Sequence, residues 1–179
     1  MKRIFIMLVL AIIIEFVSPH SAINDTVIHT AAQKAAWQRY LHVQYVVSTY
    51  KVSKQFAEDV VLLTHKYSND TFPKAKDLLA IISIESSFRP HVKSKLKTDK
   101  AVGLTQIRPK VWSHLIKPGE LSSIENQVKY GAMILTRYHE KLGDATSAVN
   151  AYNVGITAHM RGDRNQTYVS RFLAARRSI

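Results

Sequence analysis

The chain has 179 residues, 46% of them hydrophobic, and a formal net charge of +12. This length suits one domain with an appendage and excludes two full domains, because each domain needs a core of its own. The absence of cysteine excludes disulfides and thiolate metal sites, and the positive charge predicts an anionic partner such as nucleic acid, anionic lipid or a cell-wall polymer.

The N-terminus has the pattern of an export signal. Met1-Lys2-Arg3 precedes an apolar run over Ile4–Ile14, which is too short for a comfortable membrane span. We therefore expect residues 1–22 to form a signal peptide cleaved after Ala22, and the mature protein to reach the periplasm or cell envelope. His20 fits the small-residue rule at the cleavage site poorly, so retention as an uncleaved membrane anchor is the alternative. A buried first helix of a cytosolic protein is a third interpretation, which the basic start disfavours.

Helical periodicity dominates the next part of the chain. Apolar residues at near-helical intervals predict helices over Thr26–Ser48 and Lys54–Tyr67. We assign residues 23–51 to an N-terminal helical extension and residues 52–179 to the domain proper. A polar break ending in proline then precedes a third helix over Lys74–Ser87.

The second half of the chain is also predicted to be helical. Residues 91–102 are rich in lysine and lack an apolar period, which indicates an exposed loop. Ser122 and Glu125 fit a capping box for a helix that ends at Gly143. Two further helices are expected over Ala145–Tyr152, with Asp144 as N-cap, and over Gln166–Arg177. With no convincing strand pair, the fold class is mainly α with at most a minimal β element.

Glu85 is the strongest candidate for chemistry. It is a lone acid in the apolar segment Leu78–Phe88, where Leu78, Ile81 and Phe88 share its helical face. Desolvation favours the neutral acid and raises the carboxyl pKa, which is how a glutamic acid is kept able to donate a proton near neutral pH. The alternative is a structural carboxylate, for example one paired with Arg89 on the next turn.

Three stretches follow one another in the order of a known enzyme family. They are Glu85-Ser86-Ser87-Phe88-Arg89-Pro90, Gly103-Leu104-Thr105-Gln106-Ile107 and Asn150-Ala151-Tyr152-Asn153-Val154-Gly155. Their order and spacing resemble the lysozyme-like domain of soluble lytic transglycosylases, which cut peptidoglycan, over roughly residues 52–168. The resemblance implies a lysozyme-like helical domain in which all three stretches line one cleft.

The resemblance also implies a mechanism. Glu85 would protonate the oxygen between N-acetylmuramic acid (MurNAc) and N-acetylglucosamine (GlcNAc), and the acetamido group of the sugar would attack the anomeric carbon. Ionised Glu85 would then take the proton of the muramic acid O6 hydroxyl, which closes to a 1,6-anhydro product without water. No cofactor is expected. A hydrolysing lysozyme is the close alternative, for which Asp99, in a sequence typical of an exposed loop, is the nearby second acid.

Further site residues follow from the family motifs. The resemblance implies that Ser94 orients the substrate or the acid, that Gln106 binds hydroxyl or acetamido groups, and that the Tyr152 hydroxyl sits beside the acid. Ser86 and Asn153 would complete the substrate-binding set. Two family methionines are Thr105 and Arg108 here, which alters the apolar surface expected under the sugars. Lysines beside such a cleft would favour wall polymers that bear lactyl and peptide carboxylates.

Two rival classes remain. One is a non-catalytic protein with a lysozyme fold that holds glycan or packs in a larger apparatus, and it would predict loss of the acid. The other is a basic membrane-active or nucleic-acid-binding helix bundle, which leaves Glu85 without a purpose and lacks stacking aromatics. The histidines show no two-ligand spacing, so no metal site is expected. Peptidoglycan strands are the expected partner, with secretion, conjugation or phage machinery as further candidates; membrane contact is expected only through an uncleaved N-terminal segment.

Overall fold

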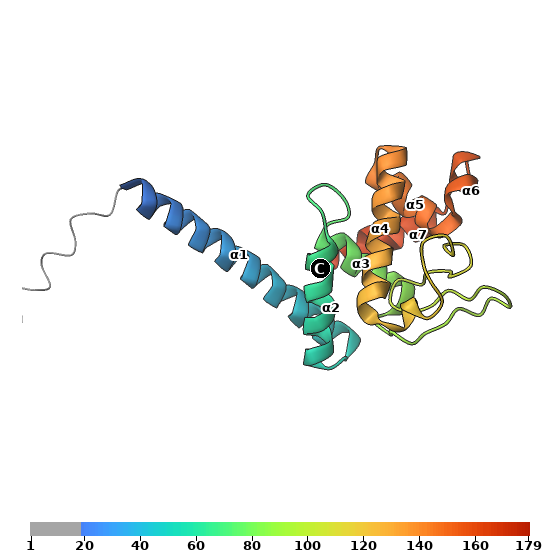
Figure 1. Cartoon of the computed structure of the whole chain (residues 1–179), viewed down its shortest axis with the longest axis horizontal. Coiled ribbons are helices and arrows are strands. Elements are labelled where there is room, and N and C mark those ends of the chain that lie inside the picture. Colours follow the sequence, from blue (N-terminus) through green and yellow to red (C-terminus); the bar gives the residue numbers. More distant parts are fainter. Residues whose placement is uncertain (1–18) are drawn as a thin grey trace, which may run out of the picture. The chain divides into compact units, whose positions relative to one another are not determined.

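The computed structural model describes residues 19–179, with side chains from residue 30 onward. The described residues form these helices (Figure 1): α1 (Pro19–Tyr50), α2 (Lys54–Tyr67), α3 (Ala75–Ser86), the 3-10 helix η1 (Glu120–Ser122), α4 (Ile124–Leu142), α5 (Ala145–Val154), α6 (Ile156–Met160) and α7 (Gln166–Ser178). The predicted mainly α fold class is confirmed. The β element consists of isolated bridges that join Val102 to Lys93 and to Ile107.

The chain divides into two units, Met1–Tyr40 and Leu41–Ile179. Helix α1 continues past this boundary, and its residues Val43 and Val46 are buried in the core of the second unit. The end of the predicted extension, which the sequence placed at residue 51, therefore contributes to the domain core. Residues 1–18 of the expected export segment lie outside the described residues. From residue 19 onward, no helix combines the length and the apolar character needed to cross a bilayer.

Helix α3 is the core helix of the domain unit. Leu78 and Ile81 belong to one hydrophobic cluster, while Leu79 and Ile82 belong to another, and all four side chains are fully buried. Helix α3 therefore packs against two hydrophobic clusters, which buries more of its surface than the single apolar face predicted from its sequence. Its last turn carries Glu85 within the domain.

Several helix ends follow the predicted signals. Helix α2 has the predicted bounds, Gly143 ends α4 with φ 80°, and the Asp144 side chain caps α5 by accepting a hydrogen bond from the Ser147 amide. Left-handed backbone at a helix C-terminus is the conformation that glycine adopts without strain. Helix α6 was not predicted, because five residues are too few to show a helical period.

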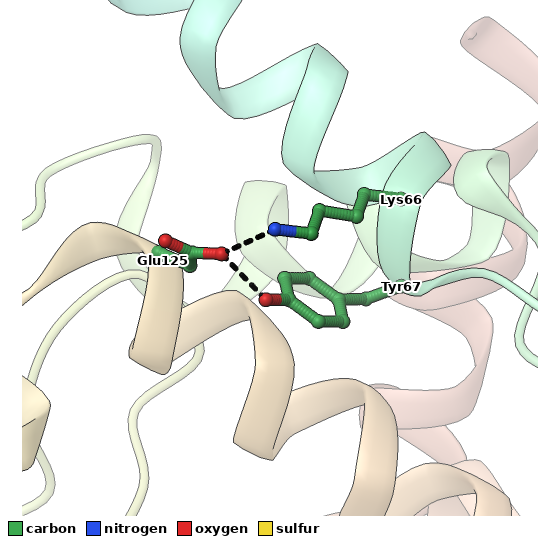
Figure 2. A network of polar contacts seen from close by, with 3 residues as sticks. All are labelled: Lys66, Tyr67 and Glu125. Atoms are coloured by element: carbon green, nitrogen blue, oxygen red, sulfur yellow. Dashed lines mark hydrogen bonds and ion pairs between the residues drawn. The ribbon is translucent and has the colours of Figure 1, made fainter.

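The predicted capping box at the start of α4 is wrong. The N-cap of α4 is Ser123, and its side chain makes no capping hydrogen bond. Figure 2 shows where the Glu125 carboxylate goes instead: Lys66 Nζ and the Tyr67 hydroxyl donate to the same oxygen, at 2.7 and 2.6 Å. These contacts join the end of α2 to the first turn of α4. Glu125 therefore makes these tertiary contacts in place of the predicted backbone cap.

Helix α7 packs against α3, with its first turn at the last turn of α3 and its last turn at the first turn of α3. The Asn165 side chain caps α7 by accepting a hydrogen bond from the Tyr168 amide at 3.0 Å. At the other end of α7, Arg176 Nε donates to the buried carboxylate of Asp77, which also caps α3 by accepting from the Lys74 amide. Both ends of α7 are therefore held, and Tyr168 and Phe172 face the core.

Candidate active site

Five of the six site residues predicted from the sequence line one cavity of about 350 Å³. Helix α3 contributes the acid, the segment between residues 94 and 111 forms one side, and the end of α5 forms another. The five residues are Glu85, Ser94, Gln106, Tyr152 and Asn153. The topology thus brings together side chains that are up to 68 positions apart in the chain.

Glu85 is half-buried at the cavity, and burial raises the pKa of its carboxyl above the ordinary value of 4.5. A hydrogen bond from Tyr168 and the positive charge of Arg171 act in the opposite direction, and burial outweighs them. Arg89, the alternative partner weighed from the sequence, donates through Nε to the Ser86 carbonyl oxygen instead. The site therefore contains a carboxylic acid that is held towards its protonated form and can donate a proton into the cavity.

Tyr168 is the nearest polar partner of the acid and was not predicted. Its hydroxyl donates a hydrogen bond of 2.5 Å to Glu85 Oε1 across 83 residues of sequence. Burial raises the pKa of the Tyr168 phenol well above 10, and the negative charge of Glu85 raises it further. The phenol stays neutral and able to donate in both protonation states of the acid. The sequence showed only a tyrosine at the start of a basic helix, which gives no signal of this contact.

A buried polar network fixes the turn before Tyr168. The Asn150 side chain accepts from the Asn165 amide at 2.7 Å, and its nitrogen donates to the Asp163 carbonyl oxygen at 3.0 Å and lies 2.8 Å from His159 Nδ1. Asn165 in turn caps the helix that carries Tyr168. This network locates the hydroxyl that bonds Glu85, because the first turn of α7 cannot move without breaking it.

Arg171 lies one turn after Tyr168 on the same helix. Its Nη2 donates to the Ile84 carbonyl oxygen at 3.1 Å, which holds the guanidinium beside the last turn of α3. Its charge lowers the pKa of Glu85. Arg171 therefore acts on the acid electrostatically from the helix that also carries Tyr168.

Tyr152 reaches the cavity from the last turns of α5. Its hydroxyl donates to the Thr105 carbonyl oxygen at 2.7 Å, and the Thr105 hydroxyl donates to the Gln127 carbonyl oxygen at 2.6 Å. Burial and the charge of Glu85 raise the pKa of the Tyr152 phenol, so it remains neutral. Thr105 itself is fully buried and does not line the cavity, and the apolar surface expected at this family position is absent there.

Gln106 is held by its own backbone neighbours. It has a positive φ of 50°, and its Nε2 donates to the Gly103 carbonyl oxygen at 2.8 Å and to the Val92 carbonyl oxygen at 3.1 Å. Both partners are acceptors, so the amide nitrogen must be the atom that faces them. The amide oxygen is left to accept a hydrogen bond from a ligand.

Gln127 is a second glutamine that sequence reasoning missed. It is buried on α4, accepts from the Leu104 amide at 2.7 Å and donates to the Leu121 and Pro90 carbonyl oxygens. A Cβ at Gly103 would lie 2.2 Å from Gln127 Cδ, and Gly103 has a φ of 77°. Only glycine allows this approach, which fixes the chain immediately before Gln106.

Ser94 and Asn153 face the cavity with one hydrogen-bonding function each to spare. Ser94 Oγ accepts from the Ala101 amide at 2.9 Å, so its proton can be donated to a ligand. Asn153 Oδ1 accepts from Asn165 Nδ2 at 2.8 Å, which leaves the Asn153 amide nitrogen as a donor. Trp112 and Tyr138, neither of them predicted, add aromatic surface to the same cavity.

Two residues weighed from the sequence lie outside the cavity. Ser86 is buried, and its hydroxyl donates to the Ile82 carbonyl oxygen at 3.1 Å, as serine commonly does within a helix. The sequence predicted that the side chain or the amide of Ser86 points towards the cleft, and the side chain does not. Asp99 accepts from the Lys110 amide at 2.8 Å and pairs with Arg108 at 3.3 Å, with only 7% of its side chain exposed. It is a loop anchor rather than the plain exposed residue expected.

Comparison with known proteins identifies one family. The model of the transglycosylase SLT domain family matches residues 65–172, a span that begins near the end of α2 and ends in α7 and includes every residue that lines the cavity. No curated protein and no solved structure matches the chain.

Proposed function

The chain belongs to the transglycosylase SLT domain family, and we propose that it is a lytic transglycosylase that cuts the MurNAc-GlcNAc β-1,4 bond of peptidoglycan with Glu85 as its only acid and base. The family has a lysozyme-like helical domain and implies transglycosylase activity on peptidoglycan. The observation that carries the assignment to Glu85 is its position: a half-buried carboxyl with a raised pKa at a cavity lined by Gln106 and Tyr152.

In the first step, Glu85 donates its proton to the glycosidic oxygen as the bond from that oxygen to the anomeric carbon breaks. The raised pKa favours the protonated form that this step needs. The acetamido oxygen of the muramic acid attacks the anomeric carbon and takes up the developing positive charge. Glu85 is left ionised, and the hydrogen bond from Tyr168 and the charge of Arg171 stabilise that state.

In the second step, ionised Glu85 accepts the proton of the muramic acid O6 hydroxyl. The O6 oxygen bonds to the anomeric carbon and displaces the acetamido oxygen, which gives the 1,6-anhydro ring and restores the acid. No water is consumed. Asp99, the second acid that a hydrolysing enzyme would use, is engaged by Arg108 and the Lys110 amide, which favours the route with one carboxyl.

The remaining cavity residues bind the sugars. Gln106 offers an amide oxygen, Asn153 an amide nitrogen and Ser94 a hydroxyl proton, so hydroxyl and acetamido groups find both donors and acceptors. The Tyr152 hydroxyl donates to the Thr105 carbonyl oxygen, and Tyr152 lines the cavity together with Glu85. The Ser86 hydroxyl is used within α3 and has no part in sugar binding in this proposal. The basic, then apolar N-terminus supports delivery to the envelope, where members of this family act.

The test is mass spectrometry of the fragments that the full chain releases from purified peptidoglycan. We expect 1,6-anhydro ends, one water lighter than reducing ends. Reducing ends alone would assign the protein to the lysozymes, and binding of peptidoglycan with no release would assign it to the non-catalytic glycan binders. A Glu85→Gln variant, run in parallel, separates the activity of this chain from that of a contaminating enzyme.

A further inference from the structure

A second cavity, larger than the first, lies in the same domain. Its volume is about 1040 Å³, against about 350 Å³ for the cavity that holds Glu85. This size is at the upper end of the range for ligand pockets. Its apolar lining includes Val92, Val102 and Ile116, and the proposed reaction uses none of its lining residues.

The two cavities share a wall that is one backbone thick. Lys93 lines the second cavity while its neighbour Ser94 lines the first, and Val102 lines the second while its neighbour Ala101 lines the first. The bridge between Lys93 and Val102 explains this alternation, because successive side chains of extended backbone point to opposite faces.

The next segment continues the wall. Arg108 lines the cavity that contains Glu85, and Lys110, two residues later, lines the second cavity. Asp99 holds this segment by pairing with Arg108 and accepting the Lys110 amide. A ligand that extends over the wall from one cavity would enter the other directly.

The charge of the second cavity is positive. Lys93, Lys110 and Lys117 line it, and no carboxylate of the described residues does. Among those residues Lys93 and Lys110 have no ion-pair partner. The third lysine, Lys117, interacts electrostatically with the Glu120 carboxylate, which also accepts a hydrogen bond from the Tyr130 hydroxyl. Glu120 does not line the cavity.

Resting on the proposed function, we infer that the second cavity binds the peptide stem attached to the muramic acid of the strand being cut. Such a stem joins small apolar side chains to several carboxylates, which matches an apolar cavity with unpaired lysines. The peptide stem is attached to the muramic acid next to the scissile bond. A strand bound at Glu85 would therefore hold its stem next to the shared wall. The second site would therefore select peptide-bearing strands over bare glycan.

The experiment compares two substrates and two double variants. The substrates are intact peptidoglycan and the same glycan strands stripped of peptides by an amidase. The first variant is Lys93→Ala with Lys110→Ala. The matched control is Lys95→Ala with Lys97→Ala. It removes two exposed lysines from the loop that carries Lys93, and neither of them lines a cavity.

We expect the Lys93/Lys110 variant to lose about threefold to tenfold in kcat/KM on intact peptidoglycan, since two exposed charge contacts are removed, and to keep its rate on stripped strands. The loss should shrink at high salt, where exposed charges are screened. An equal loss on both substrates, no loss on either, or the same loss in the control variant would overturn the inference.

A direct binding measurement keeps this inference separate from the proposed function. Calorimetry with a synthetic stem pentapeptide should show binding to wild type and to Glu85→Gln, and weaker binding to the Lys93/Lys110 variant. Absence of peptide binding overturns the inference even if the enzyme cuts peptidoglycan, whereas binding without cutting overturns only the proposed function. Binding of phosphatidylglycerol vesicles in place of the peptide, lost in the same variant, would reassign the cavity to anionic lipid.

Discussion

Glu85 and Glu125 each accept a hydrogen bond from a tyrosine hydroxyl, yet their carboxyl pKa values shift in opposite directions. Tyr168 donates to Glu85 at 2.5 Å and Tyr67 donates to Glu125 at 2.6 Å. The pKa of Glu85 is raised, chiefly by burial, while the pKa of Glu125 is lowered, chiefly by hydrogen bonds from Lys66 and Tyr67. The tyrosine contact alone therefore does not decide which glutamate can act as an acid.

The difference lies in the surroundings of the two carboxyls. The Glu125 side chain is 45% exposed, so water stabilises its charge, and Lys66 adds to that stabilisation (Figure 2). Glu85 lies in the last turn of α3, a largely buried helix, and the positive charge of Arg171 does not offset the lost hydration. Burial thus separates a carboxyl whose pKa is raised from one that forms a structural ion pair.

The largest effect is expected from removing the acid. Glu85→Gln should lower the rate of peptidoglycan cleavage by about 10²–10⁴-fold, the range of general acid and base catalysis, because glutamine cannot donate the proton. Clearing of a peptidoglycan suspension measures the rate. Glycan binding and melting temperature should change little, since Tyr168 can still donate to the amide oxygen.

Glu125→Gln is the matched control, and it should retain nearly full activity. Full activity in Glu85→Gln would remove Glu85 from the mechanism. Equal loss in both variants would mean that the two regions do not differ in function as their electrostatics imply.

Much of this comparison could be drawn from the sequence. The apolar segment before Glu85 predicted a buried acid, and the motifs around Gln106 and Tyr152 predicted its neighbours at the cavity. The bounds of α2 were read directly from its apolar period. These features are local or follow a repeated pattern, which a single sequence displays.

The rest depended on contacts that sequence spacing does not show. Tyr168 lies 83 residues from Glu85 and bonds it only because α7 packs along α3. Glu125 has the spacing of a capping box and pairs with Lys66 instead, across 59 residues. Ser86 belongs to a family motif, but its hydroxyl is used within its own helix. For Tyr168 and Glu125 a tertiary contact decided the outcome, and for Ser86 a hydrogen bond within its own helix did.

The next effect concerns the hydroxyl partner of the acid. Tyr168→Phe removes a donor that lowers the pKa of Glu85, so that pKa should rise further. Because the acid works while protonated, the alkaline limb of the kcat/KM profile should move to higher pH. The rate of the step that needs ionised Glu85 should fall by about tenfold to a hundredfold, since hydrogen bonds to charged groups contribute about 1.5–3 kcal/mol.

Tyr67→Phe makes the same change beside Glu125 and should leave the pH profile unmoved. A wild-type profile in Tyr168→Phe would show that the short contact has no part in the reaction. A shift in both variants would point to a general loss of packing.

A smaller effect is expected from loosening the turn that carries Tyr168. Asn165→Ala removes the cap of α7 and should lower the free energy of unfolding by about 1 kcal/mol, the usual contribution of an N-cap. It should also shift the pH profile in the direction of Tyr168→Phe, though less far. Ser53→Ala removes the cap of α2, away from the acid, and should cost similar stability with no shift. Identical profiles for the two variants would show that the cap acts on stability alone.

The smallest effect should appear in the pH dependence of stability, where the two glutamates have opposite signs. For Glu85 the pKa in the folded state lies above the ordinary value of 4.5. Between pH 4.5 and the folded pKa, the native state binds more protons than the unfolded state, so stability falls as the pH rises through that window. Glu85→Gln lacks this loss, and its melting temperature relative to wild type should increase over the same window.

For Glu125 the folded pKa lies below 4.5, so its contribution to stability is present above pH 4.5 and is lost as the pH falls through the folded pKa. Glu125→Gln should therefore be slightly less stable than wild type at neutral pH and equal to it in acid. Melting curves of the three proteins from acid to neutral pH measure both trends, and parallel curves would contradict the claim that burial sets the two glutamates apart.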